Sequence, residues 1–235
     1  MTLLAGSVWP AIPAEPLLVV PLGSVEQHGS HLPFGTDTAV ACAVTDGAIG
    51  SLPGALLAPA LAYGASGEHE DFPGTISIGT EALTGLLVEY GRSACRWADR
   101  VLVVNGHGGN LDALRAAVPL LRSEGRDVAW FPCAVPGGDA HAGRTETSLM
   151  LHVEPELVRG DRAVAGETTP IGALLPRLRA RGVRAVSPTG VLGDPAGATA
   201  QEGAALLADL IDRLLTAVRH WHVDDDGRLS NQTTG

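Results

Sequence analysis

Residues 100–132, RVLVVNGHGGNLDALRAAVPLLRSEGRDVAWFP, contain a complete unit of an α/β fold. The run RVLVVN (100–105) is short and apolar, which is typical of a strand buried on both faces. It leads into the polar loop GHGGN, after which we expect a helix from about Leu111 to Glu124 and a second buried strand in DVAWFP (127–132). A strand, a helix and a second strand in this order predict two parallel strands joined by a crossover helix.

The same alternation extends along the rest of the chain. Strands are expected in PLLVVPL (16–22) and ALLAPALAY (55–63), and helices over 37–52, 80–98 and 200–222. Recurrent apolar strands separated by helices predict an α/β fold with a mostly parallel central sheet covered by helices. Ligands bind at the carboxyl ends of the strands in such sheets, so the polar loops that follow the strands should meet at one edge.

The composition indicates one globular domain. The 235 residues are 45% hydrophobic and 18% charged, and no apolar run approaches the roughly 18 residues needed to span a bilayer. We expect a flexible N-terminal arm over 1–15, a single domain over 16–222 and a disordered polar tail over 223–235. The N-terminus lacks the basic segment of a secretory signal, which predicts a cytoplasmic location.

Charge and residue usage exclude several classes of protein. The net charge is −10 and the arginines are scattered, so we expect no binding to nucleic acid or to a membrane surface. All 16 basic residues are arginine, which excludes a Walker A phosphate loop and Schiff-base catalysis, because both need a lysine. The cysteines, Cys42, Cys95 and Cys133, share no short spacing, which argues against a disulfide framework and a thiolate zinc site.

Three loops that follow predicted strands carry histidine and carboxylate side chains: Glu26, His28 and Asp37 in 23–37, His107 in GHGGN, and His141 and Glu146 in 136–146. Mixed nitrogen and oxygen donors suit Zn, Fe(II), Mn or Co. A catalytic zinc usually takes three protein ligands, whereas these loops supply a set of five, two histidines and three carboxylates. Five ligands predict a pair of ions, with Asp37 as the bridging carboxylate.

Ordinary structural explanations exist for the same residues. A histidine after a strand, such as His107, is more often hydrogen-bonded than metal-bound, and the segment EQH (26–28) fits a polar loop as well as a metal site. GHGGN has the glycines of a nucleotide-binding turn but does not match GxGxxG. His69 fits either interpretation, and the remaining histidines are expected in surface or packing positions: His152, His220 and His222.

Four motifs together resemble the creatininase family of metal-dependent amidohydrolases. They are GSVEQHGSHLPFGTD (23–37), GASGEHEDFPGTIS (64–77), VNGHGGN (104–110) and HAGRTETS (141–148), which follow the family's order. The similarity spans about residues 16–222. It implies a creatininase-like three-layer α/β/α sandwich, two divalent metal ions per subunit (Zn, Fe(II) or Mn) and a homo-oligomer such as a hexamer or an octamer.

Matched position by position, the family's ligands fall on Glu26, His28, Asp37 and His107. Creatininase itself has a glutamate two residues after the last of these, where this chain has Gly109, and other members use the glutamate that corresponds to Glu146. The resemblance therefore implies one ion held by Glu26, Asp37 and His107, and a second held by His28, Asp37 and Glu146. Creatininase also places a tryptophan just ahead of HAG, where this chain reads PGGDAHAG, which implies a more open pocket.

The wider sequence, including GVLGDPAGATAQEG (190–203), is most similar to the subfamily encoded with mycofactocin biosynthesis, whose members are peptidases. This similarity implies cleavage of the modified C-terminal Val-Tyr unit from a ribosomally made precursor peptide. A hydroxide bridging the two ions would attack the amide carbonyl, and His141 and Glu146 are the expected catalytic residues, with His141 protonating the departing amine. The expected substrate-binding residues are His31, Ser66, His69, Gly108 and Gly109.

Two other functions fit the same residues. One is an amidohydrolase for a small creatinine-like or formamide compound, which would need no peptide. The other is a non-catalytic scaffold that binds a peptide through its metal ions and releases no fragment.

Overall fold

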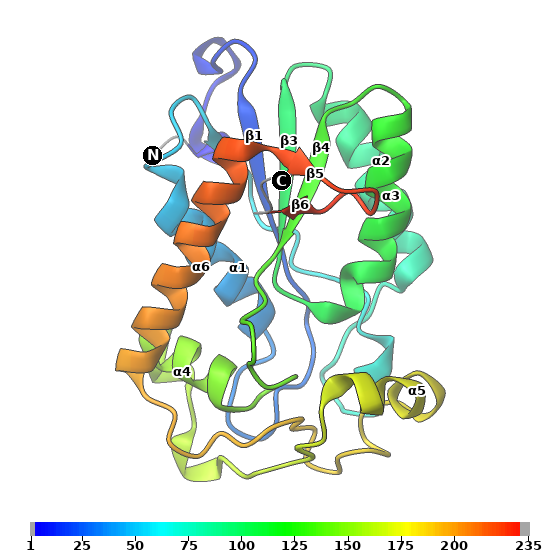
Figure 1. Ribbon diagram of the computed structural model, residues 1–235, viewed down its shortest axis with the longest axis vertical. Helices are drawn as coiled ribbons and strands as arrows, with labels where there is room; N and C mark the ends of the chain where they lie inside the picture. The colour runs from blue at the N-terminus through cyan, green and yellow to red at the C-terminus, as the bar shows by residue number, and fades with distance from the viewer. Residues whose placement is uncertain (1–2, 231–235) are drawn as a thin grey trace, which may run out of the picture.

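A four-stranded sheet lies at the centre of the protein in a computed structural model that describes residues 3–230 (Figure 1). The order across the sheet is β2-β1-β3-β4, and all neighbouring strands are parallel. The predicted parallel sheet is therefore confirmed. The strands are β1 (Leu17–Leu22), β2 (Leu56–Leu57), β3 (Arg100–Asn105) and β4 (Val128–Pro132).

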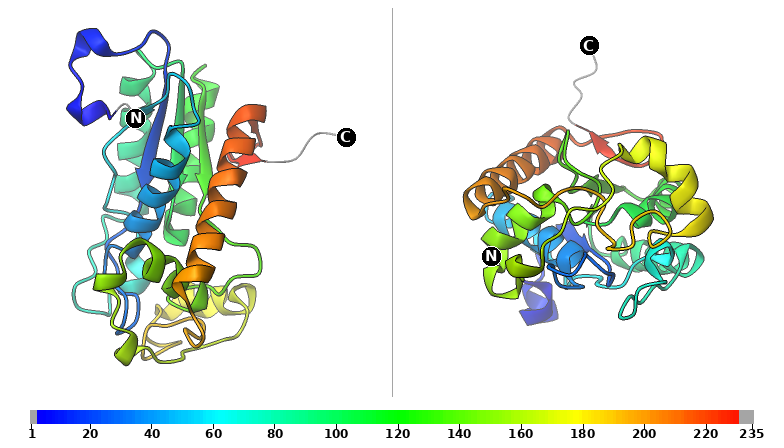
Figure 2. Two further views of the ribbon diagram at one scale, coloured as in Figure 1. Left: turned by 90° about the vertical axis from the view of Figure 1, so that its left-hand side faces the viewer. Right: turned by 90° about the horizontal axis from the view of Figure 1, so that it is seen from below.

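Helices cover both faces of this sheet (Figures 1 and 2). Val19 of β1 belongs to the core shared with one group of helices, and its neighbours Leu18 and Val20 belong to the core on the other side. Both faces are buried, which is why the strands are apolar throughout. The predicted three-layer α/β/α sandwich is confirmed. One face packs against α1 (Thr36–Ile49), α4 (Arg144–Val153) and α6 (Ala200–His220), and the other against α2 (Thr80–Ala94) and α3 (Leu111–Ser123).

Two elements differ from the sequence-based expectations. The strand expected over 55–63 is reduced to the two residues of β2, since the following segment contains Pro59, which has no N–H to donate. Helix α5 (Ile171–Arg181), which includes Pro176, was not expected. Short 3-10 helices complete the chain: Leu4–Gly6, Trp9–Ala11, Gly67–His69, Gly108–Asn110, Pro155–Leu157 and Gly160–Arg162.

The C-terminal segment is ordered over most of the expected tail. Residues 223–230 were expected to be disordered, but β5 (His222–Val223) and β6 (Leu229–Ser230) form an antiparallel pair. Leu229 is buried in the core, and the Trp130 Nε1–H of β4 donates to the Asp226 carbonyl at 2.9 Å. The expectation of a disordered tail is therefore wrong for these residues, because one apolar side chain anchors them; residues 231–235 lie outside the described part.

The expected flexible arm also contacts the domain. Leu4 and Ile12 pack against the core on the α2 side, whereas Trp9 is 87% exposed. Within residues 3–230, no helix combines the length and hydropathy needed to cross a membrane.

Candidate metal centre

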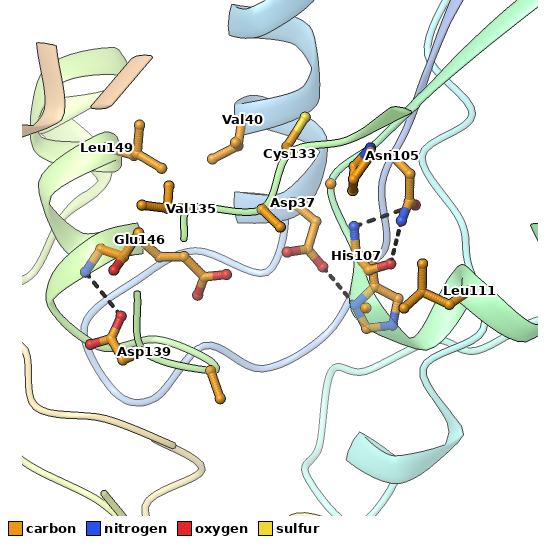
Figure 3. Close-up of a pocket in the computed structure, with 16 residues that line it drawn as sticks. Asp37, Val40, Asn105, His107, Leu111, Cys133, Val135, Asp139, Glu146 and Leu149 are labelled. Carbon is orange, nitrogen blue, oxygen red and sulfur yellow. Dashed lines mark hydrogen bonds and ion pairs between the residues drawn. The ribbon is translucent and has the colours of Figure 1, made fainter. Parts of the chain in front are cut away.

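The loops that follow β1, β3 and β4 meet at the carboxyl edge of the sheet, as the parallel topology requires (Figure 2, right). They bring together the predicted ligands, all buried except Glu146, which is about one quarter exposed. Asp37 lies in the first turn of α1, and the Ser24 hydroxyl donates to its Oδ2 at 2.5 Å. Figure 3 shows Asp37 and Glu146 directed towards the same space.

The GHGGN loop is held by two asparagines. The Asn105 side chain donates to the His107 carbonyl at 2.7 Å. The Asn110 side chain donates to the Gly23 carbonyl at 3.0 Å and accepts the Ala65 N–H at 2.9 Å. These bonds connect the loop after β3 to the loop after β1 and to the segment that carries the GASGEHEDFPGTIS motif.

Three histidines are anchored in the same way. One ring nitrogen of each lies next to a backbone carbonyl, which can only accept, so that nitrogen carries the proton. His28 Nδ1 lies 3.1 Å from the Glu26 carbonyl, His107 Nε2 lies 3.2 Å from the Ala65 carbonyl, and His141 Nε2 lies 2.7 Å from the Gln27 carbonyl. This is the arrangement by which proteins orient a metal-binding imidazole.

The other nitrogen of each ring faces carboxylate oxygens. His28 Nε2 lies 3.2 Å from Asp37 Oδ1, His107 Nδ1 lies 3.2 Å from Asp37 Oδ2, and His141 Nδ1 lies 3.5 Å from Glu26 Oε1. A lone pair and a carboxylate oxygen repel each other unless a cation or a proton lies between them. The two oxygens of Asp37 therefore face two different imidazoles, as the predicted bridging role requires.

Glu26 has the same need for a cation. Both of its carboxylate oxygens are buried and have no hydrogen-bond partner, although His69 Nε2 lies 3.3 Å from Oε1 and His107 Nε2 lies 3.1 Å from Oε2. A buried, unpaired carboxylate is costly. The donor set fits divalent ions such as Zn, Fe(II) or Mn, which take imidazole and carboxylate ligands.

The protonation of the cluster without metal follows from these contacts. Burial raises the pKa of Glu26 to about 7. Burial alone would lower the pKa of His28 and His107, but the facing carboxylates, Asp37 for the first and Glu26 with Asp37 for the second, raise both to about 10. The two imidazolium groups hold the pKa of Asp37 well below its usual range against the opposing effect of burial.

Within the described residues, three groups of three side chains are close enough to hold one metal ion each, because one donor atom from every residue of a group lies within 4.8 Å of the others. None includes His107, whose two nitrogens face different carboxylates. The groups are Glu26, His28 and Asp37; His28, His141 and Glu146; and Glu26, His69 and His141.

His141 is not placed as the expected proton donor. Its proton lies on Nε2 and is donated to the Gln27 carbonyl, while burial lowers the pKa of the ring well below its usual range. Glu146 lies at the N-terminus of α4, where Ala142, with a left-handed φ of 53°, donates its N–H to Oε2 at 2.6 Å. The same oxygen is 3.8 Å from His28 Nε2, so Glu146 lies next to the ligand with which it was grouped.

The expected substrate-binding residues lie in different surroundings. The Ser66 N–H donates to Ser77 Oγ at 3.0 Å and is not free for a substrate. His31 is buried and its Nε2 contacts Thr147 Oγ1 at 2.9 Å. His69 is buried, and its Nδ1 accepts from Gln27 Nε2 at 2.8 Å.

The two expected glycines differ from each other. Gly108 lines a cavity of about 210 Å³ that also contacts Asp37, His107 and Glu146 (Figure 3). Gly109 has no room for a side chain, because a Cβ there would lie 2.3 Å from His107 Nε2 and 2.4 Å from the Ala65 carbonyl oxygen. The glutamate that creatininase has at this position therefore does not fit this backbone.

The sequence-based reasoning missed Gln27 and Glu68. Gln27 connects three loops, because its side chain bonds to His69, to the Gly190 carbonyl and to the Gly29 N–H. Glu68 Oε1 lies 3.7 Å from His107 Nε2. Both residues stand directly beside a predicted site residue in the sequence, which is the only signal that could have found them.

Comparison with known proteins identifies the family of this chain. The family model described as "Creatininase: Creatinine amidohydrolase" matches residues 7–218. The chain belongs to the creatininase family. Membership in this family of amide hydrolases makes the protein a hydrolase, as expected.

Curated relatives and a solved structure resemble the chain over most of its length. It is 57% identical over 225 residues to the mycofactocin precursor peptide peptidase of Mycobacterium tuberculosis (strain CDC 1551 / Oshkosh), with 92% of this chain and 90% of the relative covered. It is 54% identical over 232 residues to the protein of the same name from Mycobacterium ulcerans (strain Agy99), with 95% and 90% covered. A solved mutant creatininase described as "Zn-Zn type" has a TM-score of 0.73 at 27% identity, with 93% and 97% covered.

Proposed function

We propose that the protein is a metal-dependent peptidase that hydrolyses an amide bond of the mycofactocin precursor peptide and releases its modified C-terminal Val-Tyr unit. The identity of 57% to a relative with this name carries the choice of substrate. The three histidines that donate to backbone carbonyls and face carboxylates support a metal-dependent hydrolysis.

The proposed site would hold two divalent ions, with Asp37 as a ligand of both. Glu26, Asp37 and His107 would hold one ion, and His28, Asp37 and Glu146 the other. His141 joins this set as a ligand through Nδ1, since its other nitrogen is committed to the Gln27 carbonyl. Zn, Fe(II) and Mn all suit these donors.

Ions bound there supply a water molecule with a pKa near 7 and polarise the amide carbonyl. Proton transfer and the exclusion of water depend on the protein's own side chains. Glu146 lines the 210 Å³ cavity, so its carboxylate oxygen that would not contact the ion is placed to carry a proton. The same cavity is also lined by apolar side chains, including Val40 and Leu149, which limit the entry of water.

A small-molecule amidohydrolase is the second candidate. The cavity at the ligands, about 210 Å³, is below the 300–1,000 Å³ that is usual for drug-sized ligands and by itself suits a compound as small as creatinine. This function predicts turnover of such a compound without any peptide.

One experiment separates these functions. Purified protein is loaded in parallel with Zn, Fe(II) or Mn and incubated with the modified precursor peptide, with creatinine, or with buffer, and the products are identified by mass. We expect a Val-Tyr fragment that disappears after chelation. Creatinine turnover without peptide cleavage would favour the second candidate, and peptide binding without any product would favour a scaffold.

A further inference from the structure

A second cavity of about 760 Å³ adjoins the 210 Å³ cavity at the metal ligands. The two share four lining residues, Val135, Asp139, Ala140 and Thr145. Two of these, Asp139 and Ala140, belong to the segment PGGDAHAG (136–143) that was expected to leave the pocket more open. The larger cavity therefore lies beside the space next to the candidate metal centre, and the two share part of a wall.

The volume of the larger cavity suits a peptide better than a small substrate. The 210 Å³ cavity has room for the reacting amide and little more, whereas 760 Å³ falls within the usual range for drug-sized ligands. A substrate that extends beyond its reacting amide would place the extension there.

The walls of the larger cavity combine apolar side chains with bare backbone. Segment 135–140 faces the start of α5 and residues 192–194, and α6 closes one side. Gly137, Gly138 and Gly193 add no side chains to these walls, although the Gly138 N–H already donates to the Val135 carbonyl at 3.1 Å. The apolar side chains come from Val135, Pro136, Pro170, Ile171, Leu192 and Leu206.

The charges on these walls disfavour an anion. Asp139, Asp194 and Glu202 line the cavity against a single basic residue, Arg144. The charge of Arg144 is paired, because its Nε donates to Glu202 Oε2 at 2.8 Å. Asp194 accepts the Ala196 N–H at 2.9 Å. A free carboxylate in the cavity would thus meet two acidic groups, Asp139 and Asp194, and a single basic residue that is already paired with Glu202.

We propose that the 760 Å³ cavity binds the C-terminal fragment of the peptide substrate, as an apolar segment with an uncharged end. This inference rests on the proposed function and specifies where the released unit lies. The metal ligands hold the scissile amide, and the chain on the amine side of that bond runs past Ala140 into the larger cavity.

A photo-crosslinking experiment tests the location directly. The metal-loaded protein is irradiated with two precursor peptides whose scissile amide is N-methylated. One carries a benzophenone side chain at its C-terminal residue, and the other carries it four residues before the scissile bond. We expect the first to label residues 135–140, 168–171 or 192–194, and the second to label none of these. Labelling of these segments by the second peptide alone would overturn the proposal.

Matched variants test the apolar wall. Ile171→Trp fills the cavity from the first residue of α5, whereas Leu175→Trp adds the same side chain one turn further on, at a position that lines neither cavity. We expect Ile171→Trp to raise KM for the peptide by about tenfold and Leu175→Trp to change it less than about twofold, with metal content unchanged in both. Equal effects of the two variants would refute the assignment.

The effect of the acidic walls can be measured with peptides that differ only in the charge of the C-terminus. Wild-type protein should cleave a peptide with an amidated C-terminus at least about tenfold better, in kcat/KM, than the same peptide with a free carboxylate. Asp194→Asn, which keeps the acceptor for Ala196, should narrow this ratio. No difference between the two peptides would refute the uncharged end. If wild-type protein cleaves no peptide at all, the proposed function itself fails, whereas peptide cleavage with crosslinks elsewhere rejects only the cavity assignment.

Discussion

Two adjacent glycines in the GHGGN loop provide the sharpest test of the candidate metal centre. At Gly109 a Cβ would lie within 2.6 Å of three atoms: the His107 Nε2, the Ala65 carbonyl oxygen and Glu68 Oε1. At Gly108 a Cβ would meet nothing within 4 Å, and neither glycine has the left-handed φ that resists substitution. The two alanine variants therefore add the same methyl group with opposite consequences.

The expected magnitudes follow from the packing. Overpacking costs about 1–3 kcal/mol, and in a chain of this size 1 kcal/mol corresponds to about 2–4 °C in Tm, so Gly109→Ala should lower Tm by about 2–12 °C. The Ala65 carbonyl belongs to the backbone, so His107 must move, and the affinity for metal should fall by about 10-fold or more. Gly108→Ala should be neutral or stabilise the protein by about 0.4–1 kcal/mol.

Scanning calorimetry of the chelated and metal-loaded proteins, with metal content by mass spectrometry, measures both quantities. If Gly109→Ala melted and bound metal like Gly108→Ala, the position of His107 described above would be wrong.

Three further predictions concern the ligands and the tail. Asp37→Asn should bind metal and hydrolyse peptide about 100-fold less well, because both oxygens face imidazoles; normal metal content would exclude Asp37 as the bridge. The pKa values of His28 and His107 are raised to about 10, so at pH 7 both rings are protonated on the nitrogen that a metal ion would bind. Metal uptake displaces these protons, and the affinity for metal should therefore rise with pH. Calorimetry in buffers of different ionisation enthalpy should detect about two released protons. Leu229→Ala should lower the free energy of unfolding, measured in urea, by about 2–5 kcal/mol, because this side chain is 1% exposed. A decrease below about 0.5 kcal/mol would mean that the C-terminal hairpin contributes little to stability.

The sequence was sufficient for those features that depend on a local pattern. The apolar run RVLVVN coincides with β3, because both faces of this strand are buried and the polar Asp99 and Gly106 bound it. The C-terminal hairpin was missed because a single apolar residue, Leu229, anchors an otherwise polar segment. Helix α5 was missed because a proline interrupts its pattern.

The same distinction applies to the candidate site. The meeting of the three loops follows from parallel topology alone, so it could be predicted. The direction of each histidine ring could not, because it depends on backbone carbonyls contributed by other parts of the fold, such as Ala65 for His107. The same applies to His141, whose role as a proton donor stays a prediction: the carbonyl of Gln27 accepts the proton that was assigned to the departing amine.

The sheet and the walls of the larger cavity are built from different parts of the chain. None of the segments 135–140, 168–171 and 192–194 belongs to a strand of the central sheet, and only 168–171 reaches a helix, since Ile171 is the first residue of α5. Substitutions and small insertions in such loops alter a scaffold less than changes to its strands or to the residues that hold the ligands in place. Combinatorial libraries confined to these loops are therefore a practical starting point for redirecting the hydrolase to other peptide ends while its metal chemistry and its stability are preserved.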